Sequence, residues 1–184
     1  MAAPARAWAA ELLHFWFHEL RPNQWFAPSS TLDARVRSRF GRAWATLRSQ
    51  PAASFLDDPQ SALAAVLLFD QVPRNIHRGT RAMFASDSLA RQIARAALER
   101  GWDAALSLSQ RQFLAMPLMH SEDIADQLLS LRIYAPLGPR YGWPFARSHF
   151  RMIARFGRFP HRNKVLGRSS TAAEKAAVAA GNRW

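Results

Sequence analysis

Three short polar segments hold the residue types that could bind or chemically change a ligand. Their sequences are LFDQVPRNIHRG at residues 68–79, FLAMPLMHSEDIADQ at residues 113–127 and ARFGRFPHRNKVLGRSST at residues 154–171. Together they supply carboxylates and imidazoles for proton transfer, and guanidiniums for holding anions. We therefore predict that the three segments converge into one polar cleft that binds a small anionic ligand.

In the first segment, Asp70 is expected at the C-terminal end of a buried helix. The helix dipole disfavours a carboxylate there, so Asp70 should have a cationic partner such as Arg74 or Arg78. One interpretation is a structural Asp–Arg pair that fixes the turn. The other is a carboxylate and two guanidiniums that line a pocket.

The second segment crowds polar side chains around one helix start: His120, Ser121, Glu122, Asp123, Asp126 and Gln127. Helix initiation alone explains acidic residues in a first turn. It does not explain His120 or the i,i+4 pair of Asp123 and Gln127. A histidine near carboxylates can bind a metal or act in acid–base chemistry. The spacing matches no metal-binding signature, so neither a metal site nor a cofactor is predicted.

In the third segment, Gly157 and Pro160 predict a tight loop. The loop carries Arg158, His161, Arg162 and Asn163. Arginine is a fork-shaped donor for carboxylate or phosphate, so this loop is typical of an anion-binding site. The alternative is that its arginines neutralise the carboxylates of the other two segments. Both interpretations can hold together.

These considerations give two sets of candidate residues. The candidates for proton transfer are His120, His161, Asp70, Glu122 and Asp123. The candidates for ligand contact are Arg74, Asn75, Arg78, Gln127, Arg158, Arg162 and Asn163.

The apolar residues of most of the chain recur at helical spacing, so helices are expected to position these candidate residues. We predict an all-α fold of about seven to eight helices with short connections, as in helical bundles and helical-hairpin stacks. The first helix is expected at residues 5–18, and the others are expected to begin near Thr31, Asp58, Ser86 or Asp87, Ser109, Ser121, Pro144 and Thr171. The helix after Asp58 is apolar nearly all round, which predicts a buried central helix that ends before Pro73.

A length of 184 residues fits one domain, so residues 1–184 are predicted to form a single helical domain. The chain has no cysteine, which excludes disulfides and cysteine-based metal sites. This composition fits a reducing cytosol, and a cytoplasmic location is expected. No apolar run approaches the ~20 residues of a membrane span, so no membrane association is predicted.

The net charge of +12 raises the possibility of RNA binding. Basic residues are concentrated between Arg147 and Arg168, with no acidic residue among them. However, neither aromatic platforms nor a groove-reading helix is recognisable, so nucleic acid is not the expected partner. All basic residues except Lys164 and Lys175 are arginine, which also fits the codon usage of a GC-rich genome.

The motifs of the chain resemble those of the bacterial domain-of-unknown-function family 924. They are FWF-x-EL, DQ-x-PRN-x-x-RG, MP-x-x-HSED-x-x-x-Q and RFGRFPHRN-x-x-LGR-x-ST, and they span a family-like core at residues 15–171. The resemblance implies an all-helical fold like that of tetratricopeptide repeats, and it implies no activity. His18, His77 and Met119 depart from the family pattern. The last replaces an expected glutamate next to His120 and so weakens a metal or acid–base role there.

The resemblance also supplies an alternative function. Tetratricopeptide-like folds commonly present a concave face to a protein or peptide, so the chain is alternatively a helical interaction module. Such a module predicts a groove with aromatic and arginine anchors. RNA binding through residues 147–168 is a second alternative. The sequence does not predict an oligomeric state.

Overall fold

The computed structural model describes residues 6–182, and within this range every regular element is helical. The α-helices are α1 Ala7–His14, α2 Ser30–Leu47, α3 Pro59–Val66, α4 Val72–Ile76, α5 Asp87–Glu99, α6 Leu108–Met119, α7 Ile124–Leu137, α8 Trp143–Phe156, α9 Asn163–Leu166 and α10 Ala172–Ala179. Two π-helical turns, η1 Phe15–Glu19 and η4 Leu67–Gln71, extend α1 and join α3 to α4. The remaining short elements are single turns of 3-10 helix: η2 Pro22–Gln24, η3 Ala52–Phe55, η5 Arg81–Phe84, η6 Trp102–Ala105, η7 Pro139–Tyr141 and η8 Pro160–Arg162. The all-α prediction is therefore confirmed.

The predicted count of seven to eight helices is too low. When α3, η4 and α4 are counted as one continuous run, residues 6–182 contain nine helices. The additional helix is α9, which follows η8 directly in a segment predicted to be a loop. A helix of four residues is too short to show a periodic pattern of apolar residues. The predicted start of the first helix at Ala5 lies outside the described residues.

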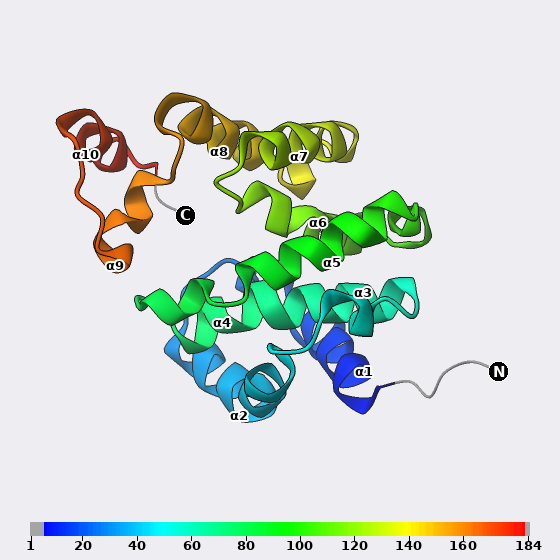
Figure 1. The fold of residues 1–184 in the computed structure, drawn as a ribbon. Helices are drawn as coiled ribbons and strands as arrows, with labels where there is room; N and C mark the ends of the chain where they lie inside the picture. The colour runs from blue at the N-terminus through cyan, green and yellow to red at the C-terminus, as the bar shows by residue number, and fades with distance from the viewer. Residues whose placement is uncertain (1–5, 183–184) are drawn as a thin grey trace.

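The helices are stacked in layers (Figure 1). α1 and α2 pack on α3 and α4, respectively, and α5 packs on α3. α6 packs on α5, α7 on α6, and α8 on α7. The short helices α9 and α10 lie beyond α8 at one end of the molecule. Within residues 6–182, no helix is both long and apolar enough to cross a membrane.

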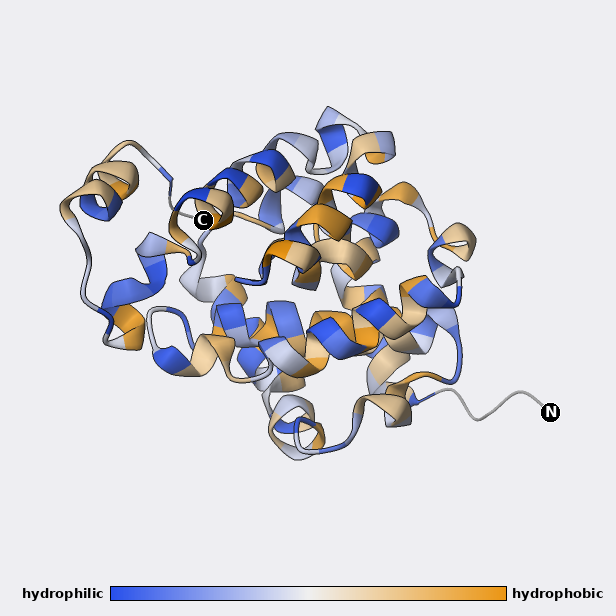
Figure 2. Ribbon diagram, turned by 45° about the horizontal axis from the view of Figure 1, so that its top comes forward, coloured by the Kyte–Doolittle hydropathy of each residue, from blue (hydrophilic) through white to orange (hydrophobic). Residues whose placement is uncertain are grey.

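The run from α3 to α4 forms the centre of the core, as predicted. Every side chain from Ala62 to Phe69 is completely buried. Large aromatic side chains from other helices surround it, including Trp16, Phe40, Phe55 and Phe113. Hydrophobic and hydrophilic residues alternate along most of the other helices (Figure 2), as expected for amphipathic helices that cover a core.

Several helix starts differ from their predicted positions by two residues. Asp58 and Thr171 are N-caps as predicted, and each side chain accepts hydrogen bonds from backbone amides of the first turn. The predicted starts at Thr31, Ser109 and Ser121 are wrong. The residues that cap these helices are Ser29, Ser107 and Asp123. Each segment contains two capping residues in close succession, and sequence alone does not choose between them.

The prediction that Pro73 ends the central helix is wrong, because the helical run continues to Ile76. Pro73 has no amide to donate to the carbonyl of Phe69, four residues earlier. The hydroxyl of Ser86 donates to that carbonyl instead, at 2.7 Å, and accepts a hydrogen bond of 2.9 Å from Nε1 of Trp44. As a result Asp70 lies inside a helical run, in the π-turn η4, and not at a helix end.

Replacing Ser86 with alanine tests the role of this hydroxyl. Ser86→Ala leaves a buried carbonyl and a buried indole N–H without partners, so we expect a loss of about 1–3 kcal/mol of unfolding free energy. Urea denaturation measures the loss. Ser88→Ala is the control, because Ser88 is exposed on the same helix and should change stability little. Equal stability of the two variants would show that the Ser86 hydroxyl does not stabilise the helical run at Pro73.

Candidate functional site

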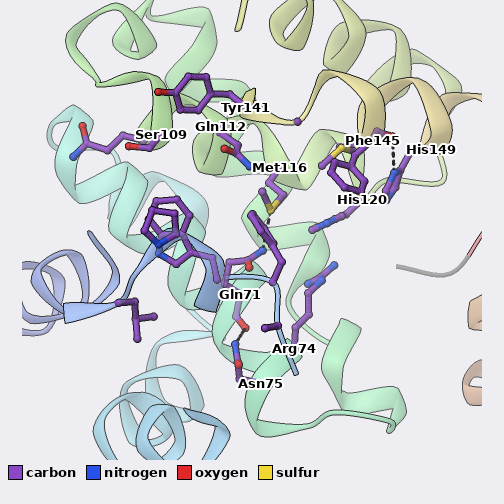
Figure 3. A pocket seen from close by; sticks show the side chains of 18 of the residues that line it. Gln71, Arg74, Asn75, Ser109, Gln112, Met116, His120, Tyr141, Phe145 and His149 are labelled. Atoms are coloured by element: carbon purple, nitrogen blue, oxygen red, sulfur yellow. Dashed lines mark hydrogen bonds between the residues drawn. The ribbon is translucent and has the colours of Figure 1, made fainter. Parts of the chain in front are cut away.

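A pocket of about 940 Å³ opens between segments that are far apart in the sequence, from Phe17 to Arg162. Its walls come from η1, the loop before α2, the η4–α4 segment, α6, α8 and the segment at His161 and Arg162. Figure 3 shows the lining side chains pointing into the space between these elements. Both π-turns of the described chain border the pocket. Such turns re-aim side chains locally, and they are frequent at functional sites.

Asp70 and His120 form a hydrogen-bonded pair at the polar end of the pocket. The carboxylate is completely buried, and its Oδ1 lies 2.8 Å from Nδ1 of His120. Burial alone would raise the pKa of Asp70, but the charge of Arg74 and the hydrogen bonds from His120 and Gln71 hold it well below its usual range. Burial lowers the pKa of His120. His120 is therefore neutral at neutral pH and donates from Nδ1 to the ionised carboxylate, which leaves Nε2 as a hydrogen-bond acceptor.

Arg74 has two carboxylate partners. Its guanidinium donates to both oxygens of Asp87, at 2.9 and 3.1 Å, and lies 3.2 Å from Asp70. It also donates to the backbone carbonyl of Asp70 at 2.5 Å. The charge of Arg74 is thus already compensated within the fold. The sequence predicts Asp87 only as a possible helix start, because the first turn of an ordinary helix explains an aspartate there equally well.

Arg162 is the second guanidinium at the polar end, and its environment is different. The residue is only 8% exposed. Its guanidinium lies over the rings of Phe159 and Phe84, at 4.4 and 4.8 Å from their centroids. Its ion-pair contact is with Asp87 at 4.0 Å, and its Nε has no hydrogen-bond partner within residues 6–182. Burial and the charge of Arg74 lower the pKa of Arg162 to about 10.

Two further histidines line the same end of the pocket. Nδ1 of His149 donates to the carbonyl of Phe145 at 2.8 Å, and the ring centroids of His149 and His120 are 6.1 Å apart. Burial lowers the pKa of His149 to about 3 and that of His161 to about 4. His161 is among the predicted residues and His149 is not, because His149 lies within the regular amphipathic helix α8 and belongs to no recognisable motif.

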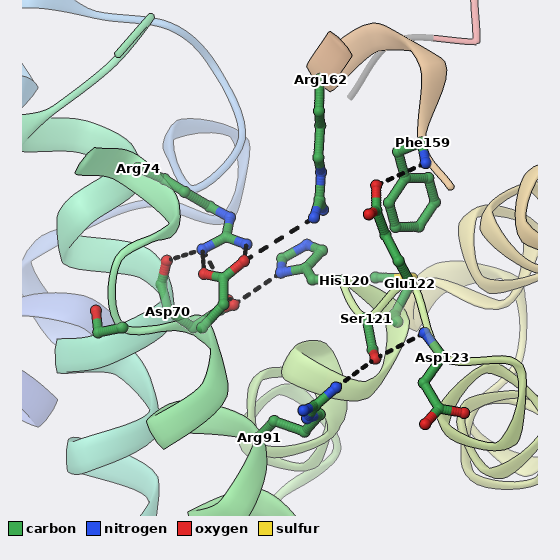
Figure 4. A network of polar contacts seen from close by, with 12 residues as sticks. Asp70, Arg74, Arg91, His120, Ser121, Glu122, Asp123, Phe159 and Arg162 are labelled. Atoms are coloured by element: carbon green, nitrogen blue, oxygen red, sulfur yellow. Dashed lines mark hydrogen bonds and ion pairs between the residues drawn. The ribbon is translucent and has the colours of Figure 1, made fainter. Parts of the chain in front are cut away.

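Asn75 and Arg78 also line the pocket, as members of the α4 segment and the turn after it. The Asn75 side chain donates to the carbonyl of Gln71 at 3.0 Å. Arg78 forms two hydrogen bonds with Asp33, at 2.8 and 2.9 Å. The structure therefore brings together seven of the residues predicted from the three polar segments. Six of them line the pocket: Arg74, Asn75, Arg78, His120, His161 and Arg162. The seventh, Asp70, does not line the pocket and binds His120 (Figure 4).

Glu122 lies next to the pocket and does not line it. It accepts two hydrogen bonds from Arg168, at 2.7 and 2.9 Å, and one from the amide of Phe159 at 2.8 Å. Figure 4 shows this contact beside Arg162, on the opposite side of His120 from Asp70. Glu122 thereby fixes the backbone that presents Phe159 and Arg162.

Four other predicted residues stabilise helix ends or the C-terminal segment. Asp123 caps α7. The amide of Gln127 donates to the carbonyls of Met119 and Ser121, both at 2.7 Å, just after α6. Arg158 binds Glu174 at 2.6 and 3.0 Å, and Asn163 contacts Ser170 and Arg168. None of these four side chains lines the pocket.

The basic segment at residues 147–168 is only partly exposed. Arg158, Arg162 and Arg168 are held by the contacts described above. Arg147, Arg151 and Arg155 are exposed along one face of α8. Within residues 6–182, no cluster of three or more histidine, aspartate or glutamate side chains is arranged to hold a metal ion.

Within residues 6–182 the chain is thus an all-helical protein with a pocket of about 940 Å³. The model of a bacterial protein family of unknown function, DUF924, matches residues 12–182, so the chain belongs to this family. A protein of unknown function from Agrobacterium tumefaciens has a similar solved structure, with a TM-score of 0.88 and 39% identity over 94% of this chain and 97% of that one. A comparison with curated proteins gives no match.

The buried histidines make the stability of the fold sensitive to acid. His149 has a folded-state pKa of about 3, compared with 6.5 when it is solvated, so the unfolded chain binds the proton first as the pH falls. The contribution of the neutral His149 to the free energy of unfolding is therefore complete above about pH 6.5 and decreases below it. The expected loss between pH 7 and pH 5 is roughly 2 kcal/mol. His161 and His120 act in the same direction.

Urea denaturation at the two pH values tests this assignment. His149→Gln should lose part of the pH dependence, whatever its absolute stability at neutral pH. If the variant keeps the full wild-type difference between the two pH values, the proton is taken up elsewhere.

Proposed function

We propose that the protein binds a small organic anion in this pocket, with the charged group of the ligand against Arg162. The proposal rests on the burial and the contacts of that guanidinium. It is buried, it lies over two aromatic rings, and its contact with Asp87 is long. A buried charge is costly unless it is paired and hydrogen-bonded. An anion at the pocket surface of Arg162 would supply the missing hydrogen bonds.

The neighbouring groups support an anion at this position. Asp87 already accepts two hydrogen bonds from Arg74, and Asp70 is engaged by His120, Gln71 and Arg74. Neither carboxylate is therefore free to move towards Arg162. Burial and the charge of Arg74 lower the pKa of Arg162 to about 10, and the charges of Asp87, Glu122 and Asp70 offset this shift only in part. A bound anion would raise that pKa again.

His120 is the group that can exchange a proton with the ligand. The Asp70 contact fixes its tautomer and orients the ring, the same arrangement that prepares a histidine for acid–base chemistry. Binding of an anion nearby favours the imidazolium form. His120 therefore takes up a proton as the ligand binds, or accepts one from it.

The alternative function, a tetratricopeptide-like interaction module, is supported by a different observation. Ile124 and Leu128 lie one turn apart on α7 and are 45% and 47% exposed. α6, α7 and α8 pack on one another in sequence, as the helical hairpins of such modules do. A protein partner would bind this outer face of α7. It would leave the charges in the pocket unexplained.

An NMR titration with sodium butyrate at constant ionic strength tests the anion site. Imidazole signals of His120 and His161 should shift with a saturable dependence on butyrate in the millimolar range. Arg162→Gln should abolish the saturable shift, since it removes the charge that holds the carboxylate. Arg151→Gln is the matched control, because Arg151 is exposed on α8 outside the pocket. Equal shifts in both variants, or none in the wild type, would refute the proposal.

Proton uptake provides a separate test of His120. Calorimetric titrations with butyrate at about pH 6, in buffers of different ionisation enthalpy, measure protons bound per ligand. We expect net uptake by the wild type and stronger binding as the pH falls, because the anion raises the pKa of the imidazole. His120→Gln should bind butyrate with less proton uptake. Unchanged uptake in this variant would assign the proton to another group.

A further inference from the structure

The pocket is much larger than the group that Arg162 would hold. Its volume of about 940 Å³ is near the upper end of the roughly 300–1,000 Å³ that is typical of small-molecule sites. Arg74, His120 and Arg162 occupy only its polar end. An ion the size of acetate or phosphate would leave most of this volume to water.

The walls of the remaining volume are aromatic and aliphatic. Phe17, Trp25 and Phe26 all contact the buried ring of Phe113, with centroid distances of 5.7, 5.1 and 5.8 Å. Nε1 of Trp25 donates to the carbonyl of Trp16 at 2.8 Å, which fixes the orientation of the indole. Flexible thioethers complete the wall, from Met83, Met116 and Met119. Such walls favour an apolar ligand surface over water.

The two most exposed large hydrophobic side chains in residues 6–182 both line this pocket. Phe26 is 58% exposed and Phe145 is 57% exposed. They come from opposite halves of the sequence, one from the loop before α2 and the other from α8. Their shared position suits an apolar body that extends from the polar end and covers both rings.

The charges of the polar end favour a ligand with a single negative charge. Arg74 is compensated by Asp70 and Asp87, and Arg78 by Asp33. Among the described lining residues, Arg162 is therefore the buried cation whose charge lacks a close carboxylate partner. A dianion such as phosphate would place its second charge close to the carboxylates of Asp70 and Asp87, which repel it.

We infer that the ligand of this pocket is an amphipathic monoanion, a carboxylate attached to an extended apolar body. The inference rests on the proposed function, since it takes the carboxylate to be held by Arg162. The apolar body lies between the aromatic walls and reaches Phe26 and Phe145. The pocket thus selects its ligand by size and apolar surface as well as by charge.

A series of straight-chain carboxylates from acetate to octanoate, with the matching alcohols, tests the inference by calorimetry. Each methylene group that leaves water for the pocket raises the affinity about fourfold. The affinity of the acids should therefore increase steeply along the series. Each alcohol should bind more weakly than the acid of the same length, and Arg162→Gln should remove this difference.

Two exposed positions allow a matched test of the apolar end. Phe26→Ser and Phe145→Ser should weaken octanoate binding and leave butyrate binding nearly unchanged. Leu128→Ser is the control, because Leu128 is similarly exposed on α7 but lies outside the pocket. A uniform effect of all three variants on octanoate would contradict the assignment of Phe26 and Phe145.

The outcomes separate this inference from the function on which it rests. Acids that bind with equal affinity, but only when Arg162 is present, would preserve the anion site and overturn the apolar body. Alcohols that bind as well as acids, with no effect of Arg162→Gln, would overturn the anion site. Phosphate that binds more tightly than octanoate would overturn the monoanion. Absence of binding by the whole series would overturn both proposals.

Discussion

The buried carboxylate of Asp70 links the η4–α4 run to the end of α6 at the polar end of the pocket. It contacts Arg74 on its own helical run and His120 at the end of α6, and Gln71 donates to its second oxygen at 2.5 Å. A carboxylate this deeply buried stays ionised only because these groups surround it. In turn it keeps Arg74 charged and fixes the tautomer of His120. The ionisation of each of these groups therefore depends on the others. Their positions depend on a helical run that continues through Pro73, where the Ser86 hydroxyl binds the carbonyl that Pro73 cannot.

A second set of contacts holds the opposite wall. Glu122 binds Arg168 and the amide of Phe159, and Arg158 binds Glu174 of α10. These contacts attach the C-terminal segment to the start of α7 and place the guanidinium of Arg162 opposite Asp70 and His120 (Figure 4). The arginines of this segment thus have two roles, as the sequence alternatives allowed. Arg158 and Arg168 neutralise acidic residues within the fold, and Arg162 faces the pocket.

The sequence predicts the helical class and the buried central helix because both follow from periodicity and apolar content over many residues. It also predicts that Asp70 has a cationic partner, although the reason was wrong: Asp70 is buried within the run and does not lie at a helix end. The remaining features depend on contacts between distant segments. Asp87 pairs with Arg74 across a turn, Ser86 replaces the amide that Pro73 lacks, and Phe26 and Phe145 meet at one pocket. No local pattern encodes such pairings.

Arg162 imposes a free-energy cost on the folded chain. Two aromatic faces offset part of the desolvation of its guanidinium, yet the contact with Asp87 is too long for a hydrogen bond. A residue chosen for stability alone would be apolar at this position, since well-packed hydrophobic side chains equal or exceed buried ion pairs in stabilising a core. The aromatic walls present a second and independent cost, because Phe26 and Phe145 remain exposed to water. The cation and the exposed rings border the same cavity, and one molecule with a charged end and an apolar body would relieve both costs at once. The coincidence of these two costs in one pocket is the physical argument for the proposed ligand.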